Sequence, residues 1–147
     1  MPSDAVNQAT QREWRELGFF YERDDGAMEW RIRGSCAGLL KFAHIFLDYS
    51  ANPRRQKLSE HNHFGPYMYL EIGTWSEPVI DNHWIAGKLA DLNRLSNLIS
   101  RKLSMARKGD VLRFRDIYAP GSSYELVLEV CDDAFDPAAA DEALGKR

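Results

Sequence analysis

Four short segments of the chain alternate between apolar and polar side chains, and this alternation limits the fold more than any other feature. Apolar residues recur at every second position, as in Trp30 and Ile32 or Leu126 and Leu128. Because successive side chains of a strand point to opposite sides of a sheet, each segment predicts a strand with one buried face. The intervening positions are polar: Glu29, Arg31, Arg33, Tyr67, Tyr69, Glu71, Arg113, Arg115, Glu125 and Glu129.

Such alternation is typical of an antiparallel sheet with one solvated face. We expect cross-strand ion pairs on that face. Alternatively, this face is a dedicated binding surface. Its two tyrosines, Tyr67 and Tyr69, favour that alternative.

Two helices separate the strands. Apolar residues recur at helical spacing after the candidate N-cap Ser35, and again over residues 88–107, where Gly109 follows the last basic residues. Asp25-Gly26 predicts a tight hairpin turn, and residues 54–65 read as a polar loop. The expected strands occupy residues 17–23, 27–33, 67–74, 79–86, 110–118 and 124–131.

This order predicts an α+β fold, a single-domain sandwich with a mostly antiparallel sheet of four to six strands and two helices packed on one face. Residues 1–16 are expected to form a flexible or weakly helical leader. Residues 17–131 form the α+β domain, and residues 132–147 an acidic C-terminal tail.

The bulk composition narrows the class of protein. The chain has 147 residues, 44% of them hydrophobic, and a net charge of −3, which argues against a general nucleic-acid binder. Cys36 and Cys131 follow no metal or redox spacing, so reduced thiols in a cytoplasmic protein are expected. The polar N-terminus lacks the apolar core of a signal peptide, and no apolar run approaches the ~20 residues that span a bilayer. We expect a cytoplasmic location and no membrane partner.

Residues 60–84 gather three of the four histidines. His61 and His63 are two residues apart, so on an extended segment they share a face. A zinc site could be completed by His83, with Asp81 and with Glu60 or Glu71 as the carboxylate candidates. The spacing matches no compact metal site, however, and Gly65-Pro66 interrupts the strand between the pair and the other candidates. We therefore interpret the pair as part of a solvated loop and assign no metal.

The same segment is rich in aromatic residues, which anchor protein interfaces. At least one of Trp75 and Trp84 is expected to fill the core, which leaves the other for a partner. Residues 116–147 carry eight Asp or Glu against Lys146 and Arg147, and these carboxylates could meet a basic partner. The predicted partner-binding set is Tyr67, Tyr69, Glu71, Trp75, Asp81, His83, Trp84, Asp132, Asp133, Phe135 and Asp136.

Complete catalytic motifs are missing from the sequence. Asp81 and His83 could form an acid–base pair, but no nucleophile is spaced to join them, and no phosphate-binding loop or nucleophile elbow occurs. We assign no catalytic residue and no cofactor.

The chain resembles, over roughly residues 28–144, a family of small bacterial immunity proteins of polymorphic-toxin systems, the immunity protein thirty-two family. The resemblance rests on Gly65-Pro66-Tyr67-Met68, Trp75 with Pro78, Asp81-Asn82-His83, Tyr118-Ala119-Pro120 and Phe135-Asp136-Pro137. It implies a cytoplasmic protein that binds and neutralises a toxin domain. It supplies no functional residues to carry over.

The sequence thus favours a non-catalytic protein-binding module that occludes a cognate toxin. One alternative is a small metal-dependent enzyme centred on His61, His63, Asp81 and His83. A second is a nucleic-acid-associated regulator that uses a basic set: Lys88, Arg94, Arg101, Lys102, Arg107 and Lys108. Whether the open sheet face forms a homodimer is left undecided.

Overall fold

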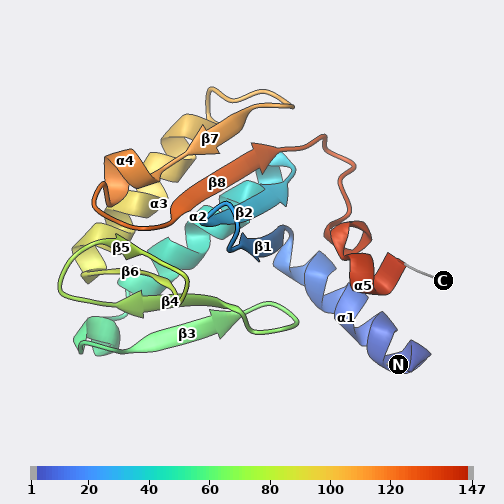
Figure 1. Cartoon of the computed structure of the whole chain (residues 1–147), viewed down its shortest axis with the longest axis horizontal. Helices are drawn as coiled ribbons and strands as arrows, with labels where there is room; N and C mark the ends of the chain where they lie inside the picture. Colours follow the sequence, from blue (N-terminus) through green and yellow to red (C-terminus); the bar gives the residue numbers. More distant parts are fainter. Residues whose placement is uncertain (1–2, 146–147) are drawn as a thin grey trace.

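The computed structural model describes residues 3–145 and contains two four-stranded sheets (Figure 1). The first has the order β1 (Phe20–Asp24), β2 (Glu29–Gly34), β8 (Glu125–Val130), β7 (Val111–Arg113). The second has the order β3 (His61–Phe64), β4 (Leu70–Thr74), β6 (Ile85–Gly87), β5 (Val79–Ile80).

Two long helices, α2 (Cys36–Ser50) and α3 (Leu89–Leu103), pack against each other and run behind the sheets in Figure 1. Ser35 begins α2, since its Oγ accepts a hydrogen bond from the Gly38 amide at 3.1 Å. The shorter elements are α1 (Asp4–Leu17), η1 (Pro53–Gln56), α4 (Arg115–Tyr118), η2 (Pro137–Ala140) and α5 (Glu142–Gly145).

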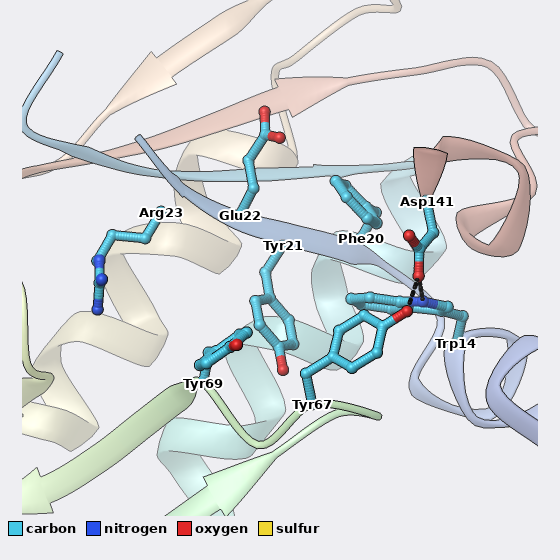
Figure 2. A pocket seen from close by; sticks show the side chains of 8 residues that line it. All are labelled: Trp14, Phe20, Tyr21, Glu22, Arg23, Tyr67, Tyr69 and Asp141. Atoms are coloured by element: carbon cyan, nitrogen blue, oxygen red, sulfur yellow. Dashed lines mark hydrogen bonds between the residues drawn. The ribbon is translucent and has the colours of Figure 1, made fainter. Parts of the chain in front are cut away.

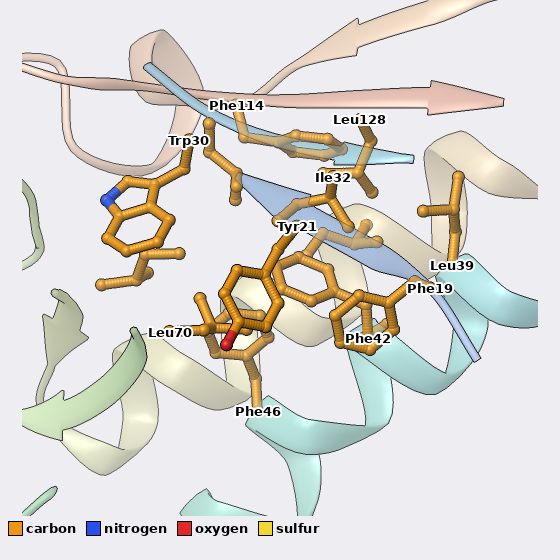
Figure 3. Packing of buried hydrophobic residues seen from close by; sticks show 14 of the residues in the cluster. Phe19, Tyr21, Trp30, Ile32, Leu39, Phe42, Phe46, Leu70, Phe114 and Leu128 are labelled. Carbon is orange, nitrogen blue, oxygen red and sulfur yellow. The ribbon is translucent and has the colours of Figure 1, made fainter. Parts of the chain in front are cut away.

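One hydrophobic core joins the two sheets and the two long helices (Figure 3). Trp30 and Ile32 of the first sheet, Phe42 and Phe46 of α2, and Leu70 of the second sheet are all fully buried. Hydrogen bonds also connect the two sheets through flanking segments: the Trp30 indole of β2 donates to the carbonyl of Asp81, just after β5, at 2.8 Å, and the hydroxyl of Tyr118 in α4 donates to the Ala86 carbonyl of β6 at 2.7 Å. The sheets are therefore held as one packed unit.

The predicted α+β class is confirmed, and four of the six strand pairings are antiparallel. The strands form two sheets instead of one, however. Each sheet contains one parallel pair, β2 with β8 in the first and β4 with β6 in the second. The prediction of a loop over residues 54–65 was wrong for residues 61–64, which form the strand β3. Cys36 and Cys131 are both free thiols.

The polar face of the first sheet is less open than the alternation predicted. Arg31 forms the expected cross-strand ion pair with Glu129 of β8 at 3.5 Å, and it also pairs along its own strand with Glu29 at 3.2 Å. Glu125 is buried, and its Oε2 accepts hydrogen bonds from the amides of Phe114, Arg115 and Leu126. Its carboxylate therefore fixes the turn into α4.

The predicted leader is a regular helix. The Ser3 Oγ accepts from the Val6 amide at 3.2 Å, and Gly18, with φ of 92°, ends α1 by donating its amide to the Trp14 carbonyl. The C-terminal tail folds back as η2 and α5 beside α1 (Figure 1). No helix among residues 3–145 has the length and apolar character needed to cross a bilayer.

Candidate functional site

The turn between β3 and β4 projects three large side chains into solvent. Tyr67, Met68 and Tyr69 are 42%, 54% and 67% exposed, and we call residues 65–69 the hairpin tip. Gly65 and Met68 both have positive φ, at 87° and 62°. A Cβ on Gly65 would lie 2.6 Å from the Tyr21 hydroxyl, so only glycine fits this position. The tip is thus a defined backbone turn.

A hollow of about 360 Å³ lies beneath the hairpin tip (Figure 2). Its walls come from α1, β1, the tip and the C-terminal segment. The lining residues are Trp14, Phe20, Tyr21, Glu22, Arg23, Tyr67, Tyr69 and Asp141. Aromatic rings form most of this wall, with charged groups at its edges.

Asp141 connects three parts of this region. Its Oδ2 accepts hydrogen bonds from the Trp14 indole at 2.9 Å and from the Tyr67 hydroxyl at 2.5 Å, and its Oδ1 accepts from the Ala143 amide. Burial, reinforced by the Asp141 carboxylate, holds the pKa of Tyr67 well above its usual range, so the hydroxyl stays protonated as a donor. The tip is therefore tied to α1 and to the C-terminal turn.

Sequence reasoning missed Trp14 and Asp141. Trp14 lies in the segment predicted as a leader, and Asp141 is one carboxylate among several in an acidic segment. Their contact spans 127 positions of the chain. The caps Ser3 and Gly18 were a usable signal that α1 is a real helix, but no local pattern marks Asp141.

The histidines and Glu71 converge on the second sheet. The antiparallel register of β3 and β4 places His63 opposite Glu71, with His63 Nε2 at 3.5 Å from Glu71 Oε1. His83 approaches the other oxygen, with Nε2 at 2.8 Å from Oε2. One ligand atom each from His61, His63 and Glu71 lies within 4.8 Å of the others. Gly65-Pro66 therefore does not separate the pair from Glu71, because the tip folds β4 back along β3.

The remaining candidates for this cluster are engaged elsewhere. Glu60 pairs with Arg55 at 2.9 Å. Asp81 Oδ1 accepts hydrogen bonds from the amides of His83 and Trp84, at 2.9 and 3.1 Å. Asp81 thus shapes its own loop, and the His83 imidazole pairs with Glu71, so the possible acid–base pair of Asp81 and His83 does not form.

The two tryptophans have different surroundings. Trp84 is 8% exposed and its ring stacks on His83, with centroids 5.0 Å apart, whereas Trp75 is 38% exposed. As expected, one ring fills the interior and the other faces solvent. Both line a hollow of about 450 Å³ together with His61, Glu71 and His83.

Fewer residues of the acidic C-terminal segment are free to contact a partner than predicted. Asp136 pairs with Arg15 at 3.0 Å, which lowers the pKa of its carboxyl, and its Oδ1 caps the Ala138 amide. Phe135 packs partly buried against the core. Asp132 and Asp133 remain exposed, with Asp132 at 3.7 Å from the Lys108 amine. Only two of the four predicted tail residues therefore face solvent fully.

Comparison with family models, with curated proteins and with solved structures finds no match to this chain.

Proposed function

We propose that this chain is a non-catalytic protein-binding module, an immunity-type protein of the cytoplasm that occludes a cognate bacterial toxin. The observation that carries the proposal is the hairpin tip. It exposes Tyr67, Met68 and Tyr69 together while Asp141 holds its base in place. The assignment to a toxin partner comes from the family resemblance.

Exposed aromatic and methionine side chains that lie side by side favour protein contact over free solvent exposure. The rings of Tyr67 and Tyr69 have centroids 6.3 Å apart. Because Tyr67 is already hydrogen-bonded and packs edge-on against Trp14 at 6.1 Å, binding costs little further side-chain entropy. A rigid aromatic tip is thus suited to filling a concave partner site.

Exposed carboxylates in the segment after β8 support the choice of a basic-rimmed partner. Asp132 and Asp133 are exposed, and the chain as a whole carries a net charge of −3. Asp136 and Phe135 contribute to the fold instead, through Arg15 and the core. We therefore assign anchoring to the tip and only a steering role to Asp132 and Asp133.

The test is calorimetric titration of the purified protein with a toxin-like domain encoded beside its gene. A stoichiometric complex is expected. Tyr69→Ala should weaken it by at least about 2 kcal/mol, roughly thirtyfold in Kd, because an exposed aromatic anchor is lost. Met105→Ala is the matched control: Met105 is 83% exposed, just beyond the end of α3, which Figure 1 places away from the tip.

Absence of binding to a toxin domain shown to be active would refute the immunity assignment. Equal affinities of the wild type and Tyr69→Ala for the toxin domain would show that the protein binds its partner but that the hairpin tip is not the anchor. Far-UV circular dichroism of both variants establishes that the fold is retained.

A small metal-dependent enzyme is the second candidate, since the structure brings His61, His63 and Glu71 together beside a hollow. Metal binding does not by itself make an enzyme, however, and Asp81, the possible acid–base partner of His83, accepts hydrogen bonds from backbone amides instead.

A further inference from the structure

The strand pairing sets up a group of potential ligands on one edge of the second sheet. His61 and His63 lie on the same side of β3, and His63 is directly opposite Glu71 of β4. The imidazole rings of His61 and His63 have centroids 5.1 Å apart. Two imidazoles and a carboxylate are therefore presented together by adjacent antiparallel strands, with no loop rearrangement required.

Hydrogen bonds fix which nitrogen each histidine presents. His61 Nδ1 lies 2.9 Å from the Ser59 carbonyl, and His63 Nδ1 lies 3.1 Å from the Met68 carbonyl. A carbonyl oxygen only accepts, so each Nδ1 must carry the proton in these contacts. Each Nε2 is then left with a lone pair whenever the ring is neutral. Metal-binding histidines are held in this way, by a second-shell acceptor on the opposite nitrogen.

Glu71 supplies the third ligand, and its carboxylate has no permanently charged cation as a partner among the described residues. Its side chain is 9% exposed, and a carboxylate so deeply buried needs compensating partners. Among residues 3–145, its ion-pair contacts are to His63 and His83, whose charge depends on protonation, and none is to a lysine or arginine. A divalent cation beside Oε1 would supply that charge at neutral pH.

We propose that His61, His63 and Glu71 bind a zinc-like divalent transition metal, with His83 as a positioning residue on Glu71 Oε2. Two imidazoles and one carboxylate suit zinc and its neighbours better than magnesium or calcium, which prefer oxygen ligands. The fourth position of a tetrahedral ion is left to water.

The geometry requires a modest contraction. Ligand atoms about 2.1 Å from a tetrahedral zinc lie roughly 3.4 Å from one another, against the 4.8 Å limit within which the three atoms lie now. To bind the ion, the exposed His61 ring and the half-buried His63 ring must close this gap by small side-chain shifts, with β3 and β4 still paired.

The experiment is titration of the whole chain alone with Zn²⁺ against a chromophoric chelator, repeated with Co²⁺ to record its absorption spectrum. One equivalent is expected, with Co²⁺ bands typical of tetrahedral coordination. His63→Gln and His61→Gln should each weaken binding by more than about 100-fold, beyond the 10–100-fold typical of second-shell losses. His83→Gln should fall within that smaller range.

His44→Gln is the matched control, because His44 is the remaining histidine and lies exposed on α2. It should bind Zn²⁺ as the wild type does. Zn²⁺ should also raise the Tm of the wild type and of His44→Gln but not that of His63→Gln, since a ligand that binds only the folded state stabilises it.

Failure of the wild type to bind Zn²⁺ would overturn the proposal. So would equal affinities for the wild type and both β3 variants, which would place the ion elsewhere. His61 is exposed, so His61→Gln retains the fold and keeps the test decisive even if His63→Gln does not. No partner protein enters the measurement, and its result is therefore independent of the proposed toxin binding.

Discussion

At the scale of single residues, Gly73 controls how the second sheet accommodates Trp84. Gly73 lies opposite His61 in the β3–β4 pairing, and a Cβ there would collide with Cε3 and Cζ3 of the Trp84 ring. Gly73→Ala should destabilise the protein by about 1–3 kcal/mol, the usual effect of overpacking a core. Urea unfolding measures the change. Gly121→Ala is the control, because its added Cβ meets no atom within 4 Å; equal loss in both variants would contradict the packing argument.

Individual side chains were predictable where the signal is local. The i, i+2 spacing correctly placed His61 and His63 on one face, and one tryptophan of the pair was expected in the core. The position of Glu71 opposite His63 was not predictable, because it depends on how the hairpin tip reverses the chain. The positive φ of Met68, a residue that rarely adopts it, helps to set that register and leaves no signal in the sequence.

At the scale of elements, α1 depends on one side chain. Trp14 is 1% exposed and packs against Phe20 and Tyr21, with ring centroids at 4.8 and 5.1 Å. Trp14→Ala should therefore cost about 3–5 kcal/mol of stability. Hydrogen exchange should show faster exchange in α1 and in the hairpin tip, because the Asp141 bridge to the tip loses one of its two donors.

Val6→Ala tests whether α1 as such is fragile. Val6 lies in the same helix but is 54% exposed, so its truncation should change stability by less than about 0.5 kcal/mol. Comparable losses in both variants would mean that helix propensity, and not the docking of Trp14, holds α1. The sequence predicted only a flexible or weakly helical leader here, because the residues that Trp14 docks against are not visible in the local pattern of α1.

At the scale of the whole molecule, the α+β class followed from hydrophobic periodicity, but the division into two sheets did not. The expected strand over residues 110–118 is β7 followed by α4, and the expected strand over residues 79–86 is the two strands β5 and β6. Alternation identifies which face of a strand is buried and says nothing about which strand lies beside it. The pairing of β2 with β8 joins distant parts of the chain in parallel, and that of β4 with β6 leaves the second sheet separate. These pairings are long-range, as are the contacts of α2 and α3 with the same strands, and long-range contacts leave no local pattern in the sequence.

Tyr118 links the two sheets through its hydrogen bond to the Ala86 carbonyl, and it makes this link sensitive to alkaline pH. Burial, followed by the nearby Asp91 carboxylate, holds the pKa of Tyr118 well above its usual range. The stability that its protonated form contributes is therefore fully present below about pH 10, the ordinary tyrosine pKa. It is lost as the pH rises further, by about 1.4 kcal/mol per unit, because the unfolded state then releases the proton and the folded state does not.

Tyr118→Phe should cost about 1 kcal/mol near pH 8, the usual worth of one hydrogen bond. Above pH 10 the difference should shrink and then reverse, because only the wild type must keep a buried phenol protonated. Urea unfolding of both proteins between pH 8 and pH 11 measures it. The other tyrosines with raised pKa, such as Tyr21, are common to both proteins and cancel in the comparison. Parallel stability curves across this range would show that the link between the sheets does not titrate.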